Sequence, residues 1–80
     1  KSAKISGVGE IMVGIEMRAG EVKRLSLSGD YFAIADPVEK LNRRLRGCRL
    51  EDAVTILADF DIGKYIVNLT TEQFINLINS

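Results

Sequence analysis

Apolar and polar residues alternate along the first half of the chain, which predicts β-strands. Between residues 10 and 18 the odd positions form one apolar face: Ile11, Val13, Ile15 and Met17. Alternation with β-branched residues is typical of a half-buried strand. The pattern resumes over residues 22–28, and residues 3–6 are a candidate edge strand. We therefore expect a small antiparallel sheet of two to three strands.

The turn between the two long strands lies around Gly20. The inward residues are odd-numbered on both strands, and directly opposed residues share a face, so the loop should hold an odd number of residues. A three-residue loop over residues 18–20 meets this condition, with Gly20 in the left-handed conformation. This loop pairs Val13 with Leu25.

The second half of the chain carries three helix-start signals. Residues 36–39 combine an N-cap aspartate, a proline at the first helical position and the glutamate of a capping box, and Gly47 can end this helix. A second helix is expected over about residues 51–59. A third begins after Thr70, where Gln73 closes a capping box. Strands followed by helices predict an α+β fold, with three helices packed on one face of the sheet.

Length and composition exclude several classes of protein. A chain of 80 residues forms a single domain, and its first residue, Lys1, suggests a piece of a longer protein or a small subunit. The 11 basic and 11 acidic residues balance, so no global field favours nucleic acid or an anionic membrane. No apolar run approaches the roughly 20 residues that span a bilayer.

Few residues could perform chemistry. Cys48 is the single cysteine and there is no histidine, which argues against a disulfide or a zinc site and fits a reducing compartment. We interpret Cys48 as an inert packing residue, and Asp59 and Asp61 as carboxylates that end a helix and solvate a turn. We expect neither a catalytic set nor a metal site in this chain.

Basic side chains gather on the first predicted helix. Lys40, Arg43 and Arg44 share one face at helical spacing. Such a face is most often simply solvated. The functional alternative is a docking surface for an acidic partner or for a phosphate of a nucleotide intermediate.

Two aromatic residues follow the last predicted strand, in a segment expected to be a loop: Gly29, Asp30, Tyr31 and Phe32. Aromatic side chains in loops often anchor interfaces. The alternative is that Phe32 and Ile34 fold back onto the core, and the sequence leaves both interpretations open.

An ordered series of short motifs covers nearly the whole chain. They lie at residues 9–11, 20–22, 28–32, 37–41, 45–47, 59–65 and 69–74. Together they resemble the C-terminal domain of bacterial lipoate–protein ligases. The resemblance implies a cytoplasmic accessory domain, fused or separate, that works with a large catalytic domain.

The resemblance also implies a reaction. These ligases use ATP and Mg²⁺ to convert lipoate to lipoyl-adenylate, and then transfer lipoyl to a lysine of lipoyl-acceptor domains. The large domain holds those ligands, and the small domain alone binds none. Residues 29–32 are then the first candidate contact with the large domain, and the basic helix is the second.

Two other classes remain as alternatives. A strand hairpin followed by helices is similar to the fold of iron–sulfur scaffold and sulfur-acceptor proteins, but residues 29–33 hold no thiol where that class places one. A generic protein-interaction module is the other alternative.

The left-handed turn gives a first prediction. Replacing Gly20 with valine should destabilise the hairpin by about 1–2 kcal/mol, because a β-branched residue resists positive φ. Urea unfolding of the variant measures this loss, and an unchanged midpoint would contradict the turn assignment.

Overall fold

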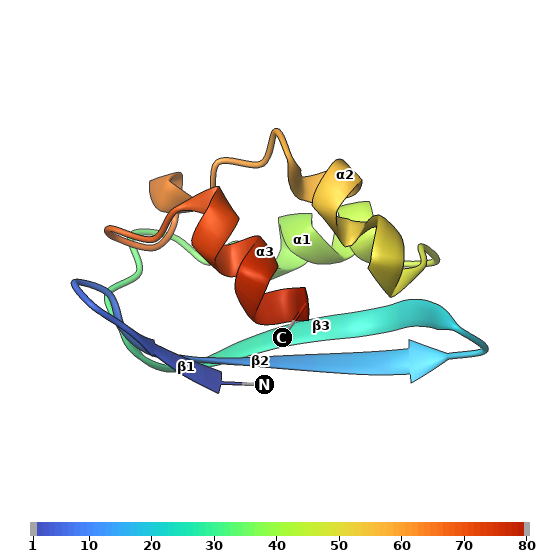
Figure 1. Ribbon diagram of the computed structural model, residues 1–80, viewed down its shortest axis with the longest axis horizontal. Helices are drawn as coiled ribbons and strands as arrows, with labels where there is room; N and C mark the ends of the chain where they lie inside the picture. The colour runs from blue at the N-terminus through green and yellow to red at the C-terminus, as the bar shows by residue number, and fades with distance from the viewer. Residues whose placement is uncertain (1, 80) are drawn as a thin grey trace.

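A three-stranded antiparallel sheet forms one layer of the molecule, and the helices pack together on one face of it (Figure 1). The computed structural model describes residues 2–79. In chain order the elements are β1 (Ser2–Ile5), β2 (Gly9–Arg18), β3 (Glu21–Tyr31), α1 (Val38–Leu45), the 3-10 turn η1 (Leu50–Asp52), α2 (Ala53–Leu57), the 3-10 turn η2 (Ile62–Lys64) and α3 (Thr71–Asn79). The predicted α+β fold is confirmed. The candidate edge strand at residues 3–6 is present as β1.

The β2–β3 hairpin has a different register from the predicted one. Val13 pairs with Leu27 rather than with Leu25. The loop has two residues, Ala19 and Gly20, whose φ angles are +54° and +81°. Two successive positive φ values are typical of a type I′ turn, which matches the twist of the strands it joins. The left-handed conformation of Gly20 is therefore confirmed, and the three-residue loop is wrong.

A β-bulge explains the difference in register. Glu16 pairs with Arg24 but Met17 pairs with Val22, so Lys23 is the extra residue of the bulge. Opposed residues still share a face, because the one extra residue that this requires is Lys23 within β3 rather than a third residue in the loop. The bulge also lets Val22, at an even position, point into the core.

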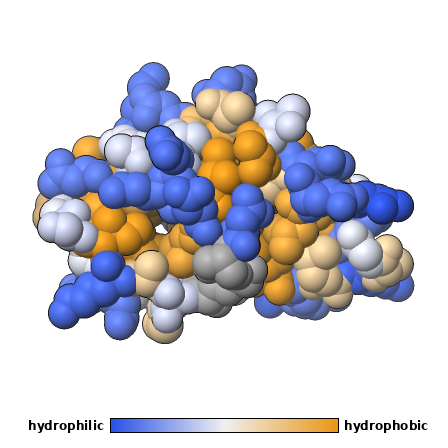
Figure 2. Space-filling model, viewed as in Figure 1, coloured by the Kyte–Doolittle hydropathy of each residue, from blue (hydrophilic) through white to orange (hydrophobic). Residues whose placement is uncertain are grey.

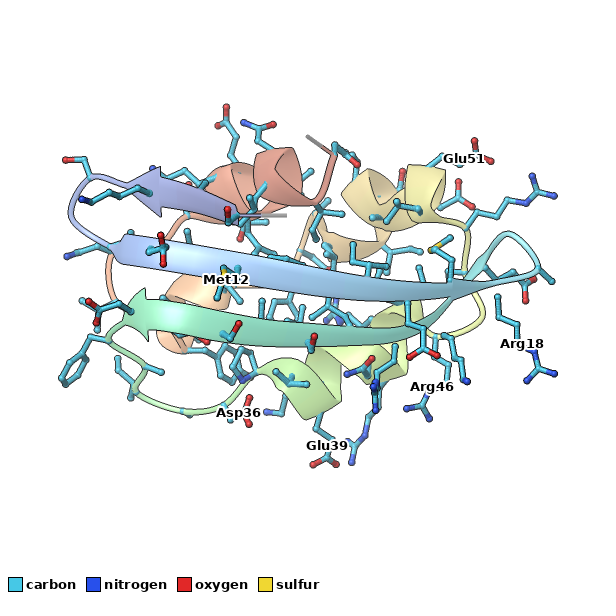
Figure 3. The ribbon with its side chains drawn as sticks, turned by 90° about the horizontal axis from the view of Figure 1, so that it is seen from below. Met12, Arg18, Asp36, Glu39, Arg46 and Glu51 are labelled. Carbon is cyan, nitrogen blue, oxygen red and sulfur yellow. The ribbon has the colours of Figure 1, made fainter. Side chains whose placement is uncertain are left out.

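The core lies between the inner face of the sheet and the helices. Each layer contributes side chains that are almost completely buried: Ile11, Val13, Val22 and Leu25 from the sheet, and Leu41, Leu45, Leu57, Ile62, Ile66, Phe74 and Ile78 from the helical layer. In the described residues 2–79, the other face of the sheet carries no helix, and Met12 lies on this open face (Figure 3).

One buried polar side chain joins α1 to the outer edge of β3. Asn42 accepts a hydrogen bond at Oδ1 from the Leu25 amide (2.8 Å), and its Nδ2 donates to the carbonyls of Leu25 (3.0 Å) and Val38 (2.9 Å). Val22 is held similarly: its amide donates to Cys48 O (2.8 Å) and its carbonyl accepts from Gly47 N (2.9 Å). The helix and its C-terminal turn thus satisfy polar groups on the β3 edge.

The helix ends largely follow the predicted caps. Asp36 Oδ1 accepts a hydrogen bond from the Val38 amide at 2.9 Å, but the N-cap of α1 is Pro37, one residue later than predicted. Glu39 does not close the predicted box and pairs with Arg43 instead. Gly47, with a φ of +82°, follows the end of α1 as predicted.

The later helices differ more in length than in position. Thr70 and Gln73 form the predicted capping box, with reciprocal bonds of 3.1 Å at the start of α3. The second helix, expected over about residues 51–59, is instead the 3-10 turn η1 followed by the short helix α2.

The Asn42 contact can be tested directly. Replacing Asn42 with alanine should lower the free energy of unfolding by about 2–4 kcal/mol, because the amide and carbonyl of Leu25 would be buried without a partner. Replacing Asn76, an exposed asparagine on α3, with alanine is the control and should change stability by less than about 0.5 kcal/mol. Equal midpoints in urea unfolding would contradict the structural role of Asn42.

Candidate functional site

Two large apolar side chains project into solvent from the segment that follows β3. Phe32 is 73% exposed and Ile34 is 66% exposed. Figure 2 shows the face of the molecule that carries α3, where apolar and charged side chains are interspersed. The interpretation that both residues fold back onto the core is therefore wrong.

The backbone that carries this apolar pair is held in place. Ile34 donates a backbone hydrogen bond to Tyr65 O (2.7 Å), and Phe32 O accepts one from Val67 N (3.0 Å). These bonds flank an antiparallel bridge between Ala33 and residue 66. Phe32 and Ile34 lie on either side of Ala33 in the chain, and both side chains are largely exposed. We call these two side chains the apolar knob.

Much of the predicted loop before Phe32 is strand. Gly29, Asp30 and Tyr31 belong to β3, and Gly29 pairs with Ile11. The Gly-Asp pair is a common turn signal. Here the glycine instead allows β3 to approach the backbone of β2 closely. Gly29 has a φ of +131°, and a Cβ on it would lie 2.3 Å from Glu10 O. The loop assignment for residues 29–31 is wrong for this reason.

Tyr31 and Phe32 lie in different environments. Tyr31 is half-buried and packs against the core. Its burial, and then the nearby charge of Asp36, raise the pKa of its hydroxyl. Only Phe32 of the predicted aromatic pair is largely available to a partner. The position of Ile34 two residues after Phe32 is the one sequence signal that links these two exposed side chains.

Two of the three predicted basic residues contact aromatic rings. Lys40 Nζ donates to the Tyr65 hydroxyl at 3.0 Å and lies 5.4 Å from the ring centre. Arg44 lies 5.1 Å from the ring centre of Phe60, which stacks on Tyr65 at 5.5 Å. These cation–π contacts attach α1 to the segment around η2.

Two of the three predicted basic residues, Arg43 and Arg44, form ion pairs with carboxylates. Arg44 pairs with Asp59, and Arg43 pairs with Glu39. The hydrogen bond and charge of Arg44 hold the pKa of Asp59 below its usual value. Lys40, Arg43 and Arg44 do line one open depression, which they share with Lys64. The structure therefore brings the three together, but commits much of their charge to contacts within the chain.

The single thiol lies at the C-terminal end of α1. Cys48 is half-buried, and its Sγ lies 3.4 Å from Arg44 O at the end of α1. Within residues 2–79, no three histidine, cysteine, aspartate or glutamate side chains are placed to hold a metal ion. No helix in the same range has the length and apolar character needed to cross a membrane.

The structure is that of a small α+β domain with two large apolar side chains exposed beside its sheet. The family model described as bacterial lipoate protein ligase C-terminus matches residues 1–78, and the chain belongs to this family. It is also 30% identical over 73 residues to the lipoate-protein ligase LplJ of Bacillus subtilis (strain 168). That match covers 89% of this chain but 22% of LplJ, so the chain spans about a fifth of its relative's length.

The close approach that positions the knob can be tested with two glycines. Replacing Gly29 with alanine should destabilise the domain by at least about 2 kcal/mol more than replacing Gly7, because both have positive φ but only Gly29 has a backbone atom in the way. The two urea midpoints give the comparison. A Gly29 variant as stable as the Gly7 variant would contradict the steric role.

Proposed function

We propose that this chain is the accessory domain of a lipoate–protein ligase. It supports the ATP-dependent conversion of lipoate to lipoyl-adenylate by a larger catalytic part, which then transfers lipoyl to a lysine of lipoyl-acceptor proteins. Membership of the family and the small share of LplJ that the chain spans support this proposal. We place ATP, Mg²⁺ and lipoate on the catalytic part, and the ligase in the cytoplasm.

The apolar knob is the observation that carries the proposal. A Phe32 that is 73% exposed leaves a large ring in water. Burying an aromatic side chain at an interface is strongly favourable, and aromatic residues often dominate binding energy. Because hydrogen bonds already fix the backbone on both sides of Ala33, docking would cost little ordering entropy.

A domain without reactive groups can assist a reaction only through binding. It must bind the catalytic part more tightly in the state that forms the adenylate than in the resting state. In this proposal Phe32 and Ile34 contact the catalytic part. Gly29 and Tyr31 act indirectly, because Gly29 allows the close approach of β3 to β2 and Tyr31, next to Phe32 in the chain, packs against the core.

The test uses the full-length ligase that contains this chain. Replacing Phe32 and Ile34 together with serine should lower lipoate-dependent exchange of pyrophosphate into ATP at least tenfold. Thermal unfolding of the protein should change little, because both side chains are already exposed. Replacing Met12 and Val54 with serine is the matched control, since they are 42% and 46% exposed elsewhere on the surface.

Comparing the two variants distinguishes loss of a specific contact with the catalytic part from a general effect of removing exposed apolar side chains. A tenfold loss in the knob variant alone supports the proposal. Unchanged exchange in the knob variant, or an equal loss in both variants, would remove the knob as the contact with the catalytic part.

A further inference from the structure

Positive charge is concentrated in one stretch of an otherwise balanced chain. Residues 40–49 hold five basic side chains and no acidic one. Four of the five have partners: Lys40, Arg43 and Arg44 as described above, and Arg49 with Glu51 at 3.5 Å. The fifth is Arg46, the residue after α1, and within residues 2–79 no carboxylate pairs with it.

The fold brings Arg46 to the hairpin end of the sheet. Hydrogen bonds between Val22 and residues 47–48 hold the end of α1 beside the start of β3. Arg46 therefore lines two neighbouring shallow depressions, one shared with Lys23 and Arg24 and the other with Arg18. Figure 3 shows Arg18 and Arg46 at the same end of the molecule, beside the β2–β3 turn.

These four basic residues form a surface with an excess of positive charge, which we call the hairpin basic surface: Arg18, Lys23, Arg24 and Arg46. Glu16 lies among them and contacts Lys23 at 3.1 Å and Arg24 at 3.5 Å. Glu21 lines the same region. Four cations against two carboxylates leave the surface positive, and no carboxylate in the described part of the chain pairs with Arg18.

The other end of the sheet has more acidic than basic residues on its strands, although Lys4 of β1 lies opposite Glu10. Glu10 and Asp30 oppose each other across β2 and β3, and Asp36 follows the apolar knob. Figure 3 places Asp36 toward that end of the molecule and Arg46 toward the hairpin end. The domain therefore presents two chemically different surfaces, and the apolar knob does not occupy the basic one.

We propose that the hairpin basic surface binds an acidic face of the protein whose lysine the ligase modifies. This inference rests on the proposed function, which requires a protein substrate. The four side chains are exposed and spread around a turn, so they fit several carboxylates distributed over a protein surface better than one small anion. Such complementary charges at an interface act mainly on encounter rate and specificity.

The test measures transfer and activation separately in the full-length ligase. Replacing Arg18 and Arg46 with glutamate should raise the KM for an unmodified lipoyl-acceptor domain about tenfold at low salt. The KM for lipoate and pyrophosphate exchange should not change. The difference should largely vanish at about 1 M salt, where the screening length is about 3 Å.

A matched control changes the same amount of charge elsewhere. Replacing Lys4 and Lys64 with glutamate removes two exposed cations that lie outside the hairpin basic surface and should leave the acceptor KM nearly unchanged. Replacing Arg18 and Arg46 with glutamine keeps side chains of similar polarity and should raise the KM about threefold. The glutamine pair also tests the surface if charge reversal at the end of α1 impairs folding.

Each other result would overturn the inference. An unchanged acceptor KM in both the glutamate and glutamine variants would show that the surface does not bind the acceptor. An equal rise in the Lys4 and Lys64 control would show a general effect of net charge. Reduced pyrophosphate exchange would assign the surface to the catalytic part. Failure of the proposed function itself is read separately, from unchanged exchange in the Phe32 and Ile34 variant.

Discussion

The hydrogen bonds between Asn42 and Leu25 hold the two layers of this domain in a fixed relation. A sheet edge presents unpaired amides and carbonyls, and a carboxamide side chain can match one residue of such an edge with both a donor and an acceptor. Asn42 makes both bonds to Leu25, and a third to Val38 one turn earlier in its own helix. The contact therefore fixes both the position of α1 along β3 and the rotation of the helix about its axis.

The placement of both proposed surfaces follows from how the β3 edge is satisfied. At one end, Val22 binds the turn after α1, and this brings Arg46 beside the hairpin. At the other end, the chain leaves β3 and pairs with residues 65–67, and this leaves Phe32 exposed. A small domain thus presents an apolar surface and a basic surface at opposite ends of one strand.

This arrangement suits a domain that acts by binding. The side chains proposed to contact partners are exposed, so they contribute little to the core. Large changes at Phe32 or Arg18 are therefore compatible with an intact fold, whereas changes at Asn42 or Gly29 affect stability. Separate surfaces also allow contact with the catalytic part and contact with a protein substrate to occur together.

Local sequence signals determined the fold class, the position of the turn and most helix ends. Strand alternation, the positive φ of Gly20 and the Thr70 cap depend on residues close together in the chain, so neighbouring residues suffice to predict them. The register, the ion pairs and the exposure of Phe32 depend on contacts between distant segments: Leu25 with Asn42, or Arg44 with Asp59. Only the tertiary structure could decide these, because burial and pairing are set by what the folded chain brings alongside each residue.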